Sequence, residues 1–319
     1  MRATMRSWRT IAAMAGLGIL AIPAFGANPG RPGTVNYIEG AAYLDGNQLT
    51  DRQVGSAAMN AGDELTTQNG KAEVLLTPGI YLRMDSNSGI KMISPDLART
   101  QVELERGRAG VEVDQIFPQN DVQIIDGGVN TQLVKTGYYE FDAAHPEALV
   151  FRGRAEVSLG DNRWEAVKGH HELALVADTH EKTHDFNASG AGDELYNWSS
   201  LRSQYLAEAN NQIAGDYAYG PGFYPGWYWD PYAWDYTFIG MNPFWSPFGW
   251  GFYPYGGWGG GWGFYGRPFY GRGYVGRAYL GHGRGFVGHP VPGGFHGGFG
   301  GGGFHGGGGF HGGGMRGGR

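Results

Sequence analysis

Histidines are the residues of this chain whose type and spacing come closest to a chemical site. His180 and His184 stand four residues apart, with His170 and His171 shortly before them. On a helix, residues at i and i+4 share a face, so two imidazoles could bind one metal ion. A protein zinc site takes three or four ligands, and no further ligand stands at a fixed spacing here. We therefore expect these four side chains to be solvated.

Five further histidines lie in a glycine-rich C-terminal stretch: His282, His289, His296, His305 and His311. Imidazoles on flexible glycine segments can gather Zn²⁺, Ni²⁺, Cu²⁺ or haem iron weakly and without fixed geometry. The alternative is a spacer in which histidine merely accompanies glycine. The sequence predicts no other cofactor.

Catalytic arrangements of other kinds do not emerge from the sequence. There is no cysteine, which excludes disulfides, thiolate metal sites and a cysteine nucleophile. No strand-borne glycine run leads into Lys-Ser or Lys-Thr, so no phosphate loop is predicted. Acidic pairs such as Asp63-Glu64 sit at predicted turns, where solvation explains them without acid–base chemistry. We predict that the protein is not an enzyme.

Charge divides the chain into unlike parts. Residues 28–215 carry 27 acidic and 15 basic side chains, a balance of −12, whereas residues 216–319 carry 6 arginines and 3 aspartates. The Gly-Arg-Gly motifs in residues 216–319 are similar to RGG-type nucleic-acid-binding segments. An acidic body and expected export argue against nucleic acid as a partner. An envelope protein or an anionic cell-surface polymer fits better.

The first 27 residues have the composition of a secretory signal peptide. Arg2, Arg6 and Arg9 precede an apolar run from Ile11 to Ala24, and small residues follow it. That run is shorter than the roughly 20 residues that span a bilayer, which favours cleavage over an uncleaved anchor. We expect export to the periplasm or cell surface of a bacterium, with no transmembrane span in the mature chain.

Residues 28–182 have the pattern of an all-β domain. Within 62–88, apolar and polar side chains alternate on both sides of Pro78-Gly79, which predicts a hairpin with one buried face. Gln68-Asn69-Gly70 predicts a turn before it. Many short strands follow, including 131–135 and 138–142, which are predicted to pair with each other. The pattern is typical of a short-stranded sandwich or a solenoid-like stack of β units.

One five-residue pattern, G-[KR]-A-x-V, occurs three times, starting at Gly70, Gly107 and Gly153. It predicts a turn glycine, an outward cation, a small inward alanine and an inward valine in each of three related β units. Coincidence in a β-rich chain is the alternative.

An amphipathic helix is predicted over residues 193–215. Its apolar positions fall on one stripe at 100° per residue, with Trp198, Leu201 and Tyr205 as anchors for packing or for a partner. Arg202 lies in that stripe and is expected to extend out along it. Docking on the β domain is the commoner role for such a helix, and binding a partner is the alternative.

Residues 216–319 form a low-complexity stretch that holds 37 of the 60 glycines and 31 of the 46 aromatic residues. Aliphatic residues are scarce, and glycine raises the entropic cost of ordering the chain. The sequence predicts a disordered tail whose aromatic residues promote self-association or tethering.

The β region resembles the FecR protein domain, the periplasmic module of the bacterial iron-dicitrate sensor family. The features that carry this likeness are Gly33-x-Val35 and Gly40, Gly62-Asp63 before Leu65, Asn69-Gly70 before Ala-Glu-Val-Leu-Leu, Pro78-Gly79 before Ile-x-Leu-Arg, and Leu104-x-x-Gly107. The likeness covers roughly residues 33–176 and implies an all-β periplasmic domain without catalytic residues. In well-known members an N-terminal cytoplasmic segment controls a sigma factor. Only ten residues precede the apolar run here, so we expect no such segment. With its helix and tail, the chain also resembles secreted FecR-domain proteins of environmental bacteria.

Three functions follow from these features. The first is that of a non-enzymatic envelope binding or scaffold protein with a self-associating or tethering tail. The second, which the family resemblance implies, is that of a periplasmic sensor component of envelope signalling. The third is metal or haem capture by the tail histidines.

Overall fold

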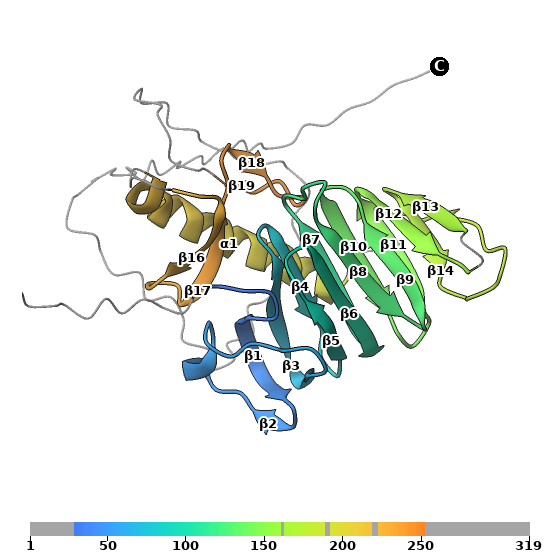
Figure 1. Ribbon diagram of the computed structural model, residues 1–319, viewed down its shortest axis with the longest axis horizontal. Helices are drawn as coiled ribbons and strands as arrows, with labels where there is room; N and C mark the ends of the chain where they lie inside the picture. Colours follow the sequence, from blue (N-terminus) through green and yellow to red (C-terminus); the bar gives the residue numbers. More distant parts are fainter. Residues whose placement is uncertain (1–28, 161–162, 189–191, 219–222, 253–319) are drawn as a thin grey trace, which may run out of the picture. The chain divides into compact units, whose positions relative to one another are not determined.

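The computed structural model describes residues 29–160, 163–188, 192–218 and 223–252, which all lie in the first of two compact units, residues 1–275. Most of this part is one large sheet that curls around an apolar core (Figure 1). Neighbouring strands are antiparallel apart from the β6–β8 pair, which is parallel. The predicted all-β class with one helix is confirmed. Residues 1–27, the predicted signal peptide, lie outside the described residues.

The sheet has two halves, which meet at strand β3. One half runs in the order β3 (Glu64–Thr77), β4 (Ile80–Met84), β7 (Arg108–Val113), β10 (Gly137–Asp142), β11 (Glu147–Arg152), β14 (His171–Ala174) and β15 (His184–Asp185). The other half runs β5 (Gly89–Pro95), β6 (Arg99–Arg106), β8 (Asp121–Asp126), β9 (Val129–Leu133), β12 (Arg154–Ser158) and β13 (Trp164–Lys168). Strand β1 (Val35–Leu44) pairs with β3 and with β2 (Asn47–Gln48), and a short 3-10 helix, Asp51–Gln53, follows.

Strand β3 belongs to both halves because its two ends pair with different strands. Residues 64–66 pair with β5, whereas residues 72–77 pair with β4. The predicted turn at Gln68-Asn69-Gly70 is wrong, since the strand continues through it. Strand β1 pairs along β3 on both sides of this point, and those ladder hydrogen bonds override the local turn preference. Gly70 is needed there for another reason: a Cβ would lie 2.4 Å from the carbonyl oxygen of Glu39.

The three repeated patterns mark the places where the chain passes from one half of the sheet to the other. Gly107 joins β6 to β7 and Gly153 joins β11 to β12, with φ of +69° and +102°. At these two positions the predicted turn glycine is confirmed. The alanines and valines of all three patterns are fully buried in the core, as predicted: Ala72, Val74, Ala109, Val111, Ala155 and Val157.

The predicted pairing of residues 131–135 with 138–142 is wrong. Strand β9 pairs with β8 and β12, whereas β10 pairs with β7 and β11. The two strands are consecutive in sequence but lie in opposite halves of the sheet. Thr136-Gly137 therefore crosses between the halves, and the short-loop preference for neighbouring strands fails here.

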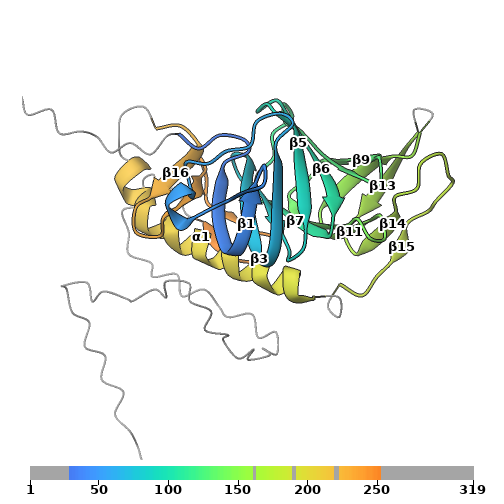
Figure 2. The same ribbon diagram turned by 90° about the horizontal axis from the view of Figure 1, so that it is seen from below.

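Helix α1 (Glu194–Ala218) packs on the outer face of the half that contains β3, β4 and β7 (Figure 2). Its start agrees with the prediction, but it continues past Gly215. None of the helices described in the structure has the length and apolar character that crossing a membrane requires.

The prediction of disorder from residue 216 onward is wrong for residues 223–252, which are folded. They form the hairpin of β16 (Gly226–Asp230) with β17 (Asp235–Ile239), and that of β18 (Phe244–Trp245) with β19 (Gly251–Phe252). We call this segment the cap. Its aromatic side chains join sheet and helix residues in a second apolar cluster of Leu75, Tyr81, Leu206, Ala207, Tyr236, Phe238 and Phe252. The scarcity of aliphatic residues predicted disorder, but aromatic side chains form the apolar cluster in their place. Residues 253–319 lie outside the described residues.

Candidate functional site

The sheet face beneath α1 is lined with charged residues that have almost no contact with water. Alternation along the strands sends apolar side chains into the core and leaves Glu73, Arg83, Glu112 and Glu140 on the outer face. Each of these four is at most 1% exposed. The strand register places Glu73 directly opposite Arg83, so an acid and a base meet across the β3–β4 pair.

Arg83 is the centre of this buried network. Its Nε donates to Glu73 Oε2 at 2.7 Å, and its Nη1 lies 2.5 Å from Glu112 Oε2. Glu73 Oε1 also accepts from Arg202 Nη2 at 3.0 Å and from Asn36 Nδ2 at 2.9 Å. Burial alone would raise the pKa of Glu73, but the guanidinium groups of Arg202 and Arg83 outweigh it and hold the pKa at about 2. Glu73 is therefore ionised in the folded protein.

Arg202 extends the network from the helix to the cap. Its Nη2 lies 2.9 Å from Asp235 Oδ2 on β17, and its guanidinium carbon stacks 4.0 Å from the centre of the Tyr37 ring. The prediction that Arg202 reaches out of its apolar stripe is wrong, because Glu73 and Asp235 supply carboxylates inside the interface. Burial raises the pKa of Asp235 to about 6, although Arg202 opposes this. One arginine thus connects sheet, helix and cap.

Further polar side chains on the inner face of α1 fit the same surface. Ser203 donates to Glu112 Oε1 at 2.6 Å, and Asn210 donates to the carbonyl of Phe238 at 2.8 Å. Tyr138 on β10 donates to Glu140 at 2.9 Å, and its hydroxyl lies 3.0 Å from Ser199 Oγ. The helix therefore docks through matched hydrogen bonds as well as through apolar contacts.

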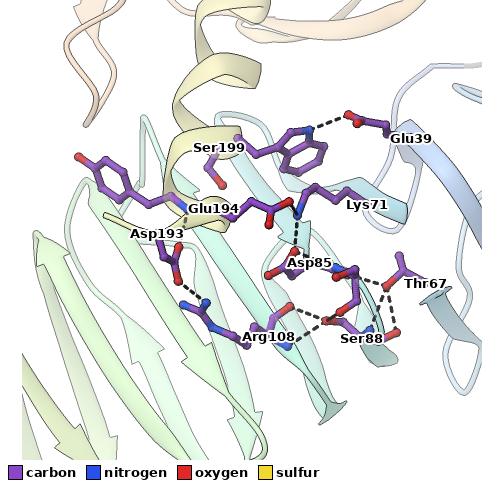
Figure 3. Close-up of polar contacts among 12 residues, drawn as sticks. Glu39, Thr67, Lys71, Asp85, Ser88, Arg108, Asp193, Glu194 and Ser199 are labelled. Atoms are coloured by element: carbon purple, nitrogen blue, oxygen red, sulfur yellow. Dashed lines mark hydrogen bonds and ion pairs between the residues drawn. The ribbon is translucent and has the colours of Figure 1, made fainter. Parts of the chain in front are cut away.

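The first turn of α1 is held by two of the repeated-pattern cations (Figure 3). Lys71 lies 3.3 Å from Glu194 and also pairs with Asp85. Arg108 pairs with Asp193 and, at 2.7 Å, with Glu140. Both acids at the start of the helix also complement the positive end of its dipole.

Asp193 caps the helix, since its Oδ1 accepts from the backbone nitrogen of Tyr196 at 3.0 Å. Nearby, burial raises the pKa of Glu140 to about 8; the Asp193 charge adds to this effect and Arg108 opposes it. Burial, and then the neighbouring Glu112, also raise the pKa of Asp114 well above its ordinary value.

The predicted helix anchors fall on different sides of α1. Trp198 is 9% exposed, and its Nε1 donates to Glu39 Oε2 at 3.0 Å, so it lies in the interface. Leu201 and Tyr205 are 44% and 39% exposed and lie on the outer side of the helix.

The predicted histidines are not brought together into one site. His171 Nε2 lies 3.0 Å from Asp185, and His180 contacts Arg163. Across the described parts of the chain, no three His, Cys, Asp or Glu side chains are arranged to hold a metal ion. The five tail histidines fall outside those parts.

The ion network itself was not predicted from the sequence. The available signal was the alternation of Glu73, Arg83 and Glu112 with apolar residues. That alternation indicates a polar outer face, but it does not reveal that a helix 90 or more residues later covers this face with complementary charges.

Residues 63–156 match the family described as FecR protein. This region is a FecR domain. The match begins at β3 and ends within β12, so the FecR domain supplies the sheet side of the ion network. Helix α1 and the cap come after the FecR domain and supply the other side.

No curated protein matches the chain. Two crystal structures of a candidate anti-sigma factor from Parabacteroides distasonis, at 2.50 and 1.65 Å resolution, are similar to it at 12% identity and a TM-score of 0.33. The matches cover 44% of this chain and 63% and 64% of those chains, which is less than two thirds of their length.

Proposed function

We propose that the protein is an exported, non-enzymatic sensor component of envelope signalling, and that its FecR domain acts with α1 to bind a protein partner. The match of residues 63–156 to the FecR family carries this proposal. A general scaffold role is compatible with the same observation but is less specific. Self-association of the tail and metal or haem capture by its histidines remain separate predictions.

The polar interface beneath α1 supports a signalling role. Interfaces between mobile parts of one chain are more polar than a domain core. Buried ion pairs add little net stability, because desolvation offsets their attraction, but they penalise wrong placements strongly. The contacts of Arg202 and Ser203 therefore favour a single docked position of the helix on the sheet. We propose that a partner binds the outer side of α1 through Leu201 and Tyr205. Binding there would change how the helix docks on the sheet.

Binding can be measured by titrating the purified protein with the periplasmic domain of a transporter or membrane regulator encoded beside it. We expect saturable binding that weakens about ten-fold or more in Leu201→Asp, since truncated interface anchors typically cost over 1.4 kcal/mol. Gln212→Ala, an exposed change on the same helix, serves as the matched control. Failure of both domains to bind the wild-type protein would contradict the proposal.

A further inference from the structure

The turn between β16 and β17 holds two aromatic side chains out in solvent. Tyr232 is 78% exposed and Trp234 is 61% exposed. Trp234 has φ of +59°, a left-handed conformation that bulky residues rarely adopt. Asp230, which is fully buried, fixes the turn: its carbonyl accepts from the Trp234 nitrogen at 2.9 Å and its carboxylate from the Tyr232 nitrogen at 2.8 Å. The fold therefore maintains this exposed pair in a defined geometry.

Trp234 is connected through Trp229 and Gly55 to an open hollow in the surface. Trp229 packs edge-on against Trp234, with ring centres 6.3 Å apart. Trp229 also lies close to Gly55, where a Cβ would meet the indole at 2.2 Å. Gly55 in turn lines a hollow of about 270 Å³, together with Pro29, Arg31, Thr34, Ser56 and Ala58. The volume lies just below the roughly 300–1,000 Å³ of pockets for drug-sized ligands, which suits one small unit of a longer chain.

Few charged side chains belong to the cap or line the hollow. The cap contains no Lys, Arg, His or Glu, and its two acids, Asp230 and Asp235, are both buried. The exposed part of the cap is therefore uncharged. Arg31 is the one charged side chain that lines the described hollow, and hydroxyl groups of Thr34 and Ser56 lie beside it.

We propose that this surface binds an acidic polysaccharide. The apolar faces of sugar rings stack on Trp234 and Tyr232, whose rings offer rigid amphipathic contact area. A carboxylate on the polymer meets the Arg31 guanidinium, whose planar fork matches carboxylate geometry. A lipid surface fits less well, because membrane-binding segments combine aromatic residues with aliphatic ones and with clustered Lys or Arg. This activity goes beyond the proposed signalling role and does not depend on it.

The test is calorimetric titration of the full chain with polygalacturonate, a polymer of carboxylated hexose, and with neutral dextran. We expect polygalacturonate binding that weakens about ten-fold or more in Trp234→Asn, in line with the loss of a central aromatic anchor. Asparagine tolerates positive φ, so this change keeps the turn while it removes the ring. Tyr232→Ser provides a second variant with the same expected direction. Arg31→Gln should weaken polygalacturonate binding and reduce its salt dependence, because one ion pair is lost.

Trp245→Ala is the matched control, since Trp245 is also 61% exposed but lies on β18 and lines a different hollow. We expect its affinity for polygalacturonate to equal that of the wild type. Thermal unfolding of each variant checks that the fold is kept. No binding of polygalacturonate by the wild type, or unchanged binding by both Trp234→Asn and Tyr232→Ser, would overturn the proposal. Binding to phosphatidylcholine vesicles without binding to polygalacturonate would overturn it in favour of a lipid surface. Titration with the periplasmic partner domain is independent of all these results.

Discussion

Arg83 has no exposed surface, yet it carries a charge between two buried carboxylates. Replacing it in Arg83→Met leaves Glu73 and Glu112 buried without this partner. We expect the free energy of unfolding to fall by about 3–5 kcal/mol, as measured by urea denaturation. Arg99→Met is the control, because Arg99 is 64% exposed in its side chain and lies 3.8 Å from Asp121. Exposed pairs contribute about 0–1 kcal/mol, so equal losses in the two variants would contradict a buried network.

Glu140 predicts a specific pH dependence of stability. Its pKa is about 8 in the folded protein and 4.5 ordinarily, so the native state binds the proton more tightly between these values. The free energy of unfolding contributed by this group therefore falls as pH rises from 4.5 to 8, by at most about 1.4 kcal/mol per pH unit, and is level above pH 8. Glu140→Gln removes this dependence. The stability difference between wild type and Glu140→Gln, measured by urea denaturation at several pH values, should shrink or reverse as pH rises. A difference that grows with pH would contradict the assignment.

At the scale of elements, α1 and the β16–β17 hairpin are expected to open together. Arg202 on α1 binds both Glu73 on the sheet and Asp235 on the hairpin. Loss of this side chain therefore removes the ion pair between helix and sheet together with the one between helix and hairpin. In Arg202→Met we expect faster amide hydrogen exchange in both elements, with β8 and β9 still protected. Gln212→Ala should leave the exchange pattern unchanged. Faster exchange in α1 alone would show that the hairpin is held independently.

The glycine links between the sheet halves can be tested by measuring the free energy of unfolding of alanine variants. Gly153 has φ of +102°, and a Cβ there would lie 2.2 Å from the Tyr139 hydroxyl. Gly62 has a similar φ of +93° but no atom within 4 Å of the same position. Gly62→Ala therefore measures the backbone strain, about 1 kcal/mol, and Gly153→Ala should lose about 1–3 kcal/mol more through crowding. Equal losses of unfolding free energy would show that the link tolerates a methyl group.

At the scale of the whole molecule, the cap completes the apolar cover of the FecR domain. Leu75 and Tyr81 of the sheet are fully buried in a cluster that includes Tyr236 and Phe238. A chain that ends at Phe252 keeps all of these contacts. A chain that ends at Ala218 should lose several kcal/mol, because fully burying each large apolar side chain contributes about 1.5–3 kcal/mol. Calorimetric unfolding of both chains gives the comparison, and equal temperatures would contradict a structural cap.

Local patterns in the sequence predicted the elements better than their partners. Alternation around Pro78-Gly79 and the buried alanines at 72, 109 and 155 follow from side-chain periodicity, which depends only on near neighbours. The course of β3 through Gly70 and the separation of β9 from β10 depend on strands elsewhere in the sheet. Arg202 was misplaced for the same reason, since its carboxylate partners lie 129 and 33 residues away.

The charged sheet face also affects the chain while only its first part has emerged into the compartment where it folds. Asn36 meets Tyr236 across 200 residues, so in an exported chain that emerges N-terminus first the cap arrives after the strands that it covers. A large apolar face left uncovered for that time invites aggregation. The face that carries Glu73, Arg83, Glu112 and Glu140 is instead well hydrated until the helix and the cap cover it. We expect Glu73→Leu combined with Arg83→Leu to yield more insoluble protein on expression, even where the finished fold tolerates the change.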